Sequence, residues 1–191
     1  MLLKNVSLFM FKTMGWKTAG SEIPKDIKKA VIACAPHTSN MDYILAMAFF
    51  YKLNLPFGYT IKKEWLERPV VGKIMSDSGA IGVERSKKGN FVDYLADILI
   101  KNEEMMLAVQ PEGTRKPVRI WRTGFYQTAL KANVPIILAY LDYEKKEAGI
   151  GPIFMPTGDY KKDMDILKDF YKDKTPQKPE NFILEIYEPE K

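Results

Sequence analysis

Short apolar runs alternate with longer segments of helical periodicity along most of this 191-residue chain. Strands that are separated by helices pack side by side in parallel, with the helices covering the sheet. A chain of this length can bury a substantial core, so we expect residues 1–191 to form a single layered α/β domain with a largely parallel central sheet flanked by helices. The expected strands are 30–35, 57–61, 80–84, 105–109, 135–141 and 182–187, and the expected helices are 41–52, 65–76, 90–102, 122–132 and 161–172.

Polar and charged residues directly follow three of the expected strands. His37 follows the first strand, Arg85 the third, and a turn at 112–115 the fourth. In parallel sheets, ligands gather where loops leave the carboxyl ends of the strands. The fold therefore predicts that these three segments lie along one edge of the sheet.

His37 is the only histidine of the chain, and Asp42 stands five residues after it. Five residues turn an unbroken helix through about 140° beyond a full turn, so the two side chains cannot share a helical face. They can meet if His37 lies on the loop after the strand and Asp42 in the first turn of the next helix, a reading favoured by the N-capping types at 38–40. A carboxylate there could fix the tautomer of an imidazole that takes up a proton. A surface histidine on a polar turn would show the same spacing.

Three further motifs stand downstream of this pair. Residues 79–85 read Gly-Ala-Ile-Gly-Val-Glu-Arg, residues 110–115 read Gln-Pro-Glu-Gly-Thr-Arg, and residues 133–138 read Asn-Val-Pro-Ile-Ile-Leu. In this order, and with the His/Asp motif before them, they resemble the four sequence blocks of the glycerolipid acyltransferase family. The best-known members of that family are the 1-acylglycerol-3-phosphate acyltransferases. The resemblance implies a glycerol-3-phosphate acyltransferase-like fold.

The resemblance also implies roles for the residues of the first block. His37 would act as the general base that deprotonates an acceptor hydroxyl, and Asp42 would orient the imidazole and stabilise its cationic form. The hydroxyl would attack the thioester carbonyl directly, without an acyl-enzyme. The donor would be acyl-CoA or an acyl-carrier protein acting as co-substrate, and no further cofactor is implied.

The remaining site residues would bind a phosphorylated acceptor. Arg85 and Arg115 would contact phosphate oxygens, while Gly113 would let the backbone approach and offer its N–H. Thr114 belongs to the same turn, and the family assigns Glu112 to acceptor binding, by accepting from a hydroxyl or by holding an arginine. Alternatively, Glu112 and Arg115 form a salt bridge that only holds the turn.

The acceptor itself remains open between several lipids. The simplest is 1-acylglycerol 3-phosphate, which would give phosphatidic acid. Relatives usually end the second block in Asp-Arg after bulky apolar residues, whereas this chain has Glu84-Arg85 with Gly82 two positions earlier. Glycerol 3-phosphate, another lysophospholipid or a lyso-aminolipid are therefore alternatives. A different class, a non-catalytic basic protein that binds lipid surfaces, would not need the His/Asp pair.

The charge and the cysteine content of the chain limit the classes of ligand and partner that we expect. The chain has 29 Lys plus Arg against 24 Asp plus Glu, a net charge of +5 that suits phosphorylated substrates or anionic lipids. It has neither a nucleic-acid module nor a concentrated basic stripe, so we expect no nucleic-acid partner. With one histidine and one cysteine a transition-metal site is not expected, and Cys34 fits a small core residue better than a nucleophile.

The first sixteen residues allow two interpretations. They form an apolar helix with lysines nearby, which either packs on the core or lies in the headgroup region of a membrane. Phe9, Phe11 and Trp16 give more bulky apolar surface than one packed stripe needs, which favours membrane contact. No run approaches the ~20 apolar residues of a membrane span, and no secretory signal is apparent. We therefore expect a cytoplasmic protein, peripheral on the inner face of the cytoplasmic membrane.

Overall fold

The computed structural model describes residues 2–83 and 91–185, which form one α/β domain around a seven-stranded sheet. The strand order is β1-β7-β6-β2-β5-β3-β4. All neighbouring strands pair in parallel except β6 and β7, which are antiparallel. The strands are Lys17–Gly20 (β1), Lys29–Cys34 (β2), Phe57–Lys62 (β3), Ala80–Val83 (β4), Met105–Val109 (β5), Ile136–Asp142 (β6) and Glu147–Phe154 (β7).

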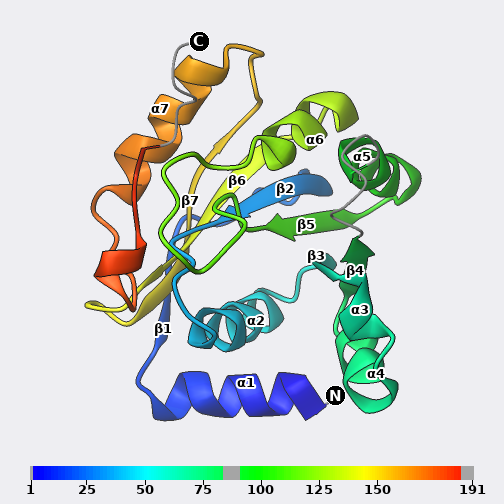
Figure 1. Cartoon of the computed structure of the whole chain (residues 1–191), viewed down its shortest axis with the longest axis vertical. Helices are drawn as coiled ribbons and strands as arrows, with labels where there is room; N and C mark the ends of the chain where they lie inside the picture. The colour runs from blue at the N-terminus through cyan, green and yellow to red at the C-terminus, as the bar shows by residue number, and fades with distance from the viewer. Residues whose placement is uncertain (1, 84–90, 186–191) are drawn as a thin grey trace.

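Helices cover both faces of this sheet (Figure 1). One face carries α1 and α2, and the other carries α5, α6 and α7. The helices are Leu2–Thr13 (α1), Met41–Leu53 (α2), Lys63–Leu66 (α3), Pro69–Asp77 (α4), Phe91–Lys101 (α5), Gly124–Ala132 (α6) and Tyr160–Tyr171 (α7), and a 3-10 turn spans Pro179–Asn181.

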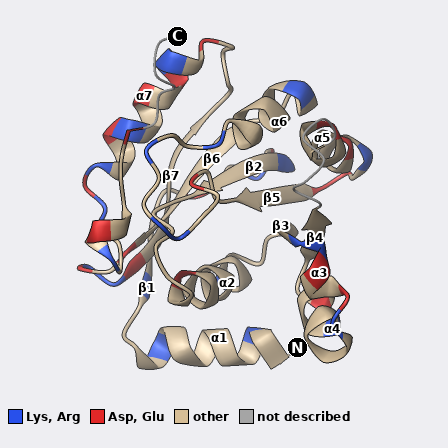
Figure 2. Cartoon of the chain, in the orientation of Figure 1, with Lys and Arg blue, Asp and Glu red and all other residues tan. Residues whose placement is uncertain are grey.

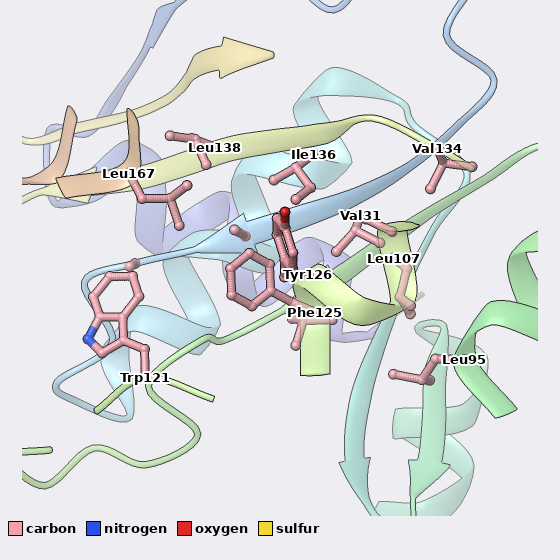
Figure 3. Packing of buried hydrophobic residues seen from close by; sticks show 14 of the residues in the cluster. Val31, Leu95, Leu107, Trp121, Phe125, Tyr126, Val134, Ile136, Leu138 and Leu167 are labelled. Atoms are coloured by element: carbon pink, nitrogen blue, oxygen red, sulfur yellow. The ribbon is translucent and has the colours of Figure 1, made fainter. Parts of the chain in front are cut away.

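The two faces of the central strands alternate between two apolar cores. Val31 of β2 points to the α6 side, whereas Ile32 belongs to the core under α2. Figure 3 shows Val31 and Ile136 facing Phe125 of α6. Strands that are buried on both faces read as continuous apolar runs, which is why β2, β5 and β6 were predictable. Each fully buried Val, Leu, Ile or Phe contributes about 1.5–3 kcal/mol to the free energy of folding.

Two expected elements differ from the structure. The helix expected at 65–76 is divided into α3 and α4, because Pro69 begins a new helix and its ring keeps Arg68 in an extended conformation. The strand expected at 182–187 is wrong for residues 182–185, which are irregular. Phe182 packs on the Trp121 ring, and the Trp121 indole N–H donates to the Ile183 carbonyl, so this segment lies against side chains and not along the sheet.

Strands β1 and β7 were not predicted. Glycines interrupt the apolar pattern of β7 and lower its apparent β propensity. They are nevertheless required by packing. A Cβ on Gly149 would lie 2.5 Å from the Ala19 carbonyl oxygen, and a Cβ on Gly151 would lie 2.2 Å from the Phe170 ring.

Helix α1 has one buried side and one exposed apolar side, so each interpretation of the N-terminal segment applies to part of it. Phe11 and Trp16 are buried with exposures of 1% and 6%, so these two residues pack on the core and the argument that assigned them to a membrane is wrong. Leu2, Val6 and Phe9 are exposed and, at about 100° per residue, fall within about 60° of one another on the opposite face. Helix α1 therefore packs on α2 with one side and presents an apolar stripe on the other.

Candidate active site

The His/Asp motif adopts the strand–loop–helix arrangement that its spacing predicts. Strand β2 ends at Cys34, His37 lies on the following loop, and Asp42 lies in the first turn of α2. The His37 Nδ1 atom is 3.5 Å from the Asp42 Oδ2 atom. The side chain of His37 is 15% exposed and that of Asp42 is 4% exposed, so the pair sits at the surface with the carboxylate on its inner side. With Nδ1 turned to Asp42, Nε2 is the nitrogen left to accept a proton.

Hydrogen-bond donors surround the Asp42 carboxylate. Its Oδ2 accepts from the backbone N–H groups of Thr38 at 2.6 Å and Ser39 at 2.8 Å. Its Oδ1 accepts from the Ser39 hydroxyl at 2.8 Å and the Tyr143 hydroxyl at 2.6 Å. Burial opposes ionisation, but the hydrogen bonds from His37, Tyr143 and Ser39 outweigh it and lower the pKa of Asp42. Asp42 is therefore a charged partner for the imidazole.

The turn after β5 lies directly beside this loop. Strands β2 and β5 are parallel neighbours with Ala33 opposite Val109, so their following loops emerge together. Both carboxylate oxygens of Glu112 accept from the His37 backbone N–H, at 2.8 and 3.1 Å. The two motifs, which are far apart in the sequence, are thus joined in one site.

Glu112 contacts the protein backbone in a way that neither sequence hypothesis anticipated. It is 4% exposed, and no ion pair joins it to Arg115, so the salt-bridge alternative is wrong. Burial raises the pKa of Glu112 to about 8, against the hydrogen bond from His37, with the Asp42 charge adding to the rise. Glu112 holds the loop that carries the histidine.

The rest of the turn is more exposed. Gly113 has a φ of +67°, which favours glycine, and its N–H donates to the Gln110 carbonyl at 3.1 Å, so this N–H is directed into the turn. The Thr114 hydroxyl accepts from the Lys116 N–H at 3.2 Å, and Arg115 is exposed. Arg85, the second expected phosphate ligand, lies outside the described residues.

Two more arginines that the motifs did not indicate follow on the same loop. Arg119 and Arg122 are exposed, and the loop from 113 to 123 contains no acidic residue (Figure 2). The Arg122 side chain crosses the turn closely enough that a Cβ on Gly113 would lie 3.1 Å from its Cγ. A run of cations without acids could have been noticed in the sequence, but the packing of Arg122 against the turn at Gly113 could not.

Comparisons with known proteins identify the family and the fold. The family model described as Acyltransferase matches residues 17–141, which is more than half of the chain. The chain belongs to the acyltransferase family.

Among solved structures, this acyltransferase is similar to the 1-acyl-sn-glycerophosphate (LPA) acyltransferase PlsC from Thermotoga maritima. The TM-score is 0.54 and the sequence identity 17%, over 90% of this chain and 74% of that one. The similarity confirms the predicted acyltransferase-like α/β fold. A comparison with curated proteins found no match.

An apolar pocket leads from His37 into the space between α2 and the sheet. Ala46, Met47 and Phe50 line it from α2, and Ala108 and Ala139 line it from the strands. Most of its lining is apolar, and His37 and Asp42 are the only basic and acidic residues among the described residues that line it. The cavity volume, however, is only about 40 Å³, which is room for a few water-sized groups at the histidine.

Cys34 also lines this pocket, but its thiol is in an environment of low reactivity. Burial raises the pKa of its thiol to about 12, only partly opposed by a backbone hydrogen bond. Because the thiolate is the reactive form, Cys34 is not a nucleophile at neutral pH. Within residues 2–83 and 91–185, no group of three or more His, Cys, Asp or Glu could hold a metal ion, and no helix is long and apolar enough to cross a membrane.

Proposed function

We propose that this acyltransferase moves a fatty acyl group from an acyl thioester to the hydroxyl of a lysophospholipid. The most economical acceptor is 1-acylglycerol 3-phosphate, and the product would then be phosphatidic acid. The observation that carries the proposal is the His37–Asp42 pair, held by Glu112 at the carboxyl edge of the sheet in a chain of the acyltransferase family.

The geometry suits direct transfer with one base. Nε2 of His37 takes the proton of the acceptor hydroxyl as its oxygen attacks the thioester carbonyl carbon. Asp42 remains ionised and stabilises the imidazolium through Nδ1. The carbon–sulfur bond then breaks, and Nε2 returns its proton to the leaving thiolate. No serine or cysteine nucleophile takes part, which agrees with the neutral Cys34 thiol.

Each substrate has a suitable surface. The apolar pocket under His37, with a volume of about 40 Å³, would receive the part of the acyl chain next to the thioester. Arg115 would bind the acceptor phosphate at the rim, together with Arg85, and the thioester donor would be acyl-CoA or an acyl-carrier protein. A guanidinium group presents paired donors that match the geometry of phosphate oxygens.

The enzyme would reach its lipid substrates as a peripheral protein on the inner face of the cytoplasmic membrane. Leu2, Val6 and Phe9 offer an apolar stripe at the surface of α1, while the buried side of the helix fixes it to α2. Exposed Lys12 at the end of the helix adds attraction to anionic headgroups.

The direct test is an acylation assay with purified protein, radiolabelled acyl-CoA or acyl-carrier protein, and a panel of lyso-lipids. We expect labelled phosphatidic acid from 1-acylglycerol 3-phosphate, with slower reaction of an acceptor that lacks the phosphate. A preference for glycerol 3-phosphate or for a lyso-aminolipid would replace the acceptor and keep the chemistry. Absence of acyl transfer to every acceptor with both donors would refute the proposal.

A further inference from the structure

Tyr143 is the only residue from outside the two motifs whose side chain donates a hydrogen bond to the catalytic pair in the part of the chain that is described. It follows directly after β6, at the same edge of the sheet as His37, but 101 residues from Asp42 in sequence. Its hydroxyl donates to Asp42 Oδ1 at 2.6 Å. Neither a motif nor the family blocks point to it.

Tyr143 is held by a ring contact and by a backbone hydrogen bond. The Trp16 ring meets it edge-on, with ring centroids 4.9 Å apart and planes at 85°. Its backbone N–H donates to the Thr175 carbonyl at 2.8 Å. Three residues further on, Lys178 N–H donates to the Thr38 hydroxyl at 3.2 Å, so the segment after α7 braces both Tyr143 and the catalytic loop. A hydroxyl held in this way has a fixed direction.

The donors divide the two carboxylate oxygens of Asp42 between them. Oδ1 is occupied by the hydroxyls of Tyr143 and Ser39, while Oδ2 receives two backbone N–H groups and faces His37 Nδ1. The torsion that turns a carboxylate about its own axis is soft, so donors on both oxygens are needed to fix its plane. Tyr143 is the only one of these donors that does not belong to residues 38–39.

We propose that Tyr143 is a positioning residue of the active site, which fixes the plane of the Asp42 carboxylate and thereby the tautomer of His37. This inference rests on the proposed general-base function. A phenol is suited to the task because it donates without neutralising the carboxylate. Burial, together with the hydrogen bond to Asp42, raises the pKa of Tyr143 well above its usual value, so the donor persists through the physiological pH range.

The test compares two Tyr→Phe variants that each remove one hydroxyl. In Tyr143→Phe the hydrogen bond to Asp42 is lost, whereas Tyr126→Phe removes a hydrogen bond of similar length, 2.8 Å, to the Asp163 carboxylate on α7. Loss of a hydrogen bond to a charged group typically changes an equilibrium or rate constant by about 10–150-fold. We expect kcat to fall at least about 10-fold in Tyr143→Phe with KM values within about twofold, because positioning affects the transition state and not substrate binding. Tyr126→Phe should keep its kcat.

The single histidine allows a second readout that does not depend on activity. Nitrogen-15 NMR of the imidazole should show the Nδ1–H tautomer as the main neutral form in the wild type and in Tyr126→Phe, with a smaller Nδ1–H fraction in Tyr143→Phe. Unchanged tautomers, or an equal loss of kcat in both variants, would overturn the positioning role. If Tyr143→Phe shows the tautomer shift but the wild type shows no acyl transfer, the proposed function fails and the positioning by Tyr143 stands.

A measurement on the unmodified protein applies if Tyr143→Phe does not fold. A hydroxyl proton in a 2.6 Å hydrogen bond to a buried carboxylate should exchange slowly and give a downfield resonance near the Tyr143 ring signals. Its observation supports the inference. A hydroxyl that exchanges freely with water would contradict it.

Discussion

Asp42 and Glu112 are both buried carboxyl groups that accept hydrogen bonds from the same loop, yet their pKa values shift in opposite directions. Asp42 receives four donors to its side chain from protein groups other than His37, and its pKa is lowered despite burial. Among the residues that the structure describes, Glu112 receives a hydrogen bond only from the His37 N–H, and burial raises its pKa. The number of donors therefore decides which carboxyl carries the charge that the imidazole needs.

Glu112 should make the stability of the protein depend on pH. Its folded-state pKa of about 8 lies above the ordinary value of 4.5, so its stabilising contribution is complete below about pH 4.5 and is lost as the pH rises through 8. Relative to Glu112→Gln, which keeps an acceptor for the His37 N–H, the wild type should lose on the order of a few kcal/mol of unfolding free energy over that interval. Urea denaturation of both proteins at pH 5 and pH 8 measures the difference. Parallel pH dependences would show that Glu112 ionises normally.

Arg115 should act on the acceptor and not on the chemistry. Arg115→Ala is expected to raise the KM for a phosphorylated acceptor about 10- to 150-fold, the usual cost of losing a hydrogen bond to a charged group, with a smaller effect on the donor KM. Lys116→Ala is the matched control, since it removes an exposed cation from the same loop. Steady-state kinetics with a phosphorylated acceptor and one without phosphate decide the matter. An equal effect on both acceptors would remove Arg115 from the phosphate site.

At the scale of elements, α1 shows how one helix can serve two environments. The buried side around Ser7 and Phe11 packs on α2, and the opposite side carries Leu2, Val6 and Phe9. Deleting the helix would therefore mix a loss of stability with a loss of membrane contact. Substitutions confined to the exposed stripe separate the two effects.

The double variant Leu2→Ser/Phe9→Ser should no longer sediment with anionic liposomes, while its melting temperature stays close to that of the wild type, because both side chains are more than 60% exposed. The control is Tyr94→Ser/Ile100→Ser, which removes two exposed apolar side chains from α5 on the other side of the sheet. This control should sediment normally, and added salt should weaken binding. Full sedimentation of the α1 variant would place the membrane contact elsewhere.

For the whole molecule, the features that could be predicted from the sequence are those formed by residues close together in the chain. Strands β2, β5 and β6 are buried on both faces and can be recognised in the sequence as apolar runs. The glycines of β7 are explained only by close contacts with Ala19, Tyr140 and Phe170, which are distant in the sequence or cannot be read from it. The strand–loop–helix geometry of His37 and Asp42 was predictable because it is set within six residues. The contacts of Glu112 and Tyr143 span 75 and 101 residues, so no local pattern could reveal them.

The central claim is that His37 is the general base of an acyl transfer, and activity of the His37→Ala variant tests it most directly. General-base assistance contributes about 10²–10⁴-fold, so kcat for acylation of 1-acylglycerol 3-phosphate should fall by at least about 100-fold. The melting temperature should change little, because His37 lies on a surface loop. A well-folded His37→Ala variant that retains more than about a tenth of the wild-type kcat would contradict the account.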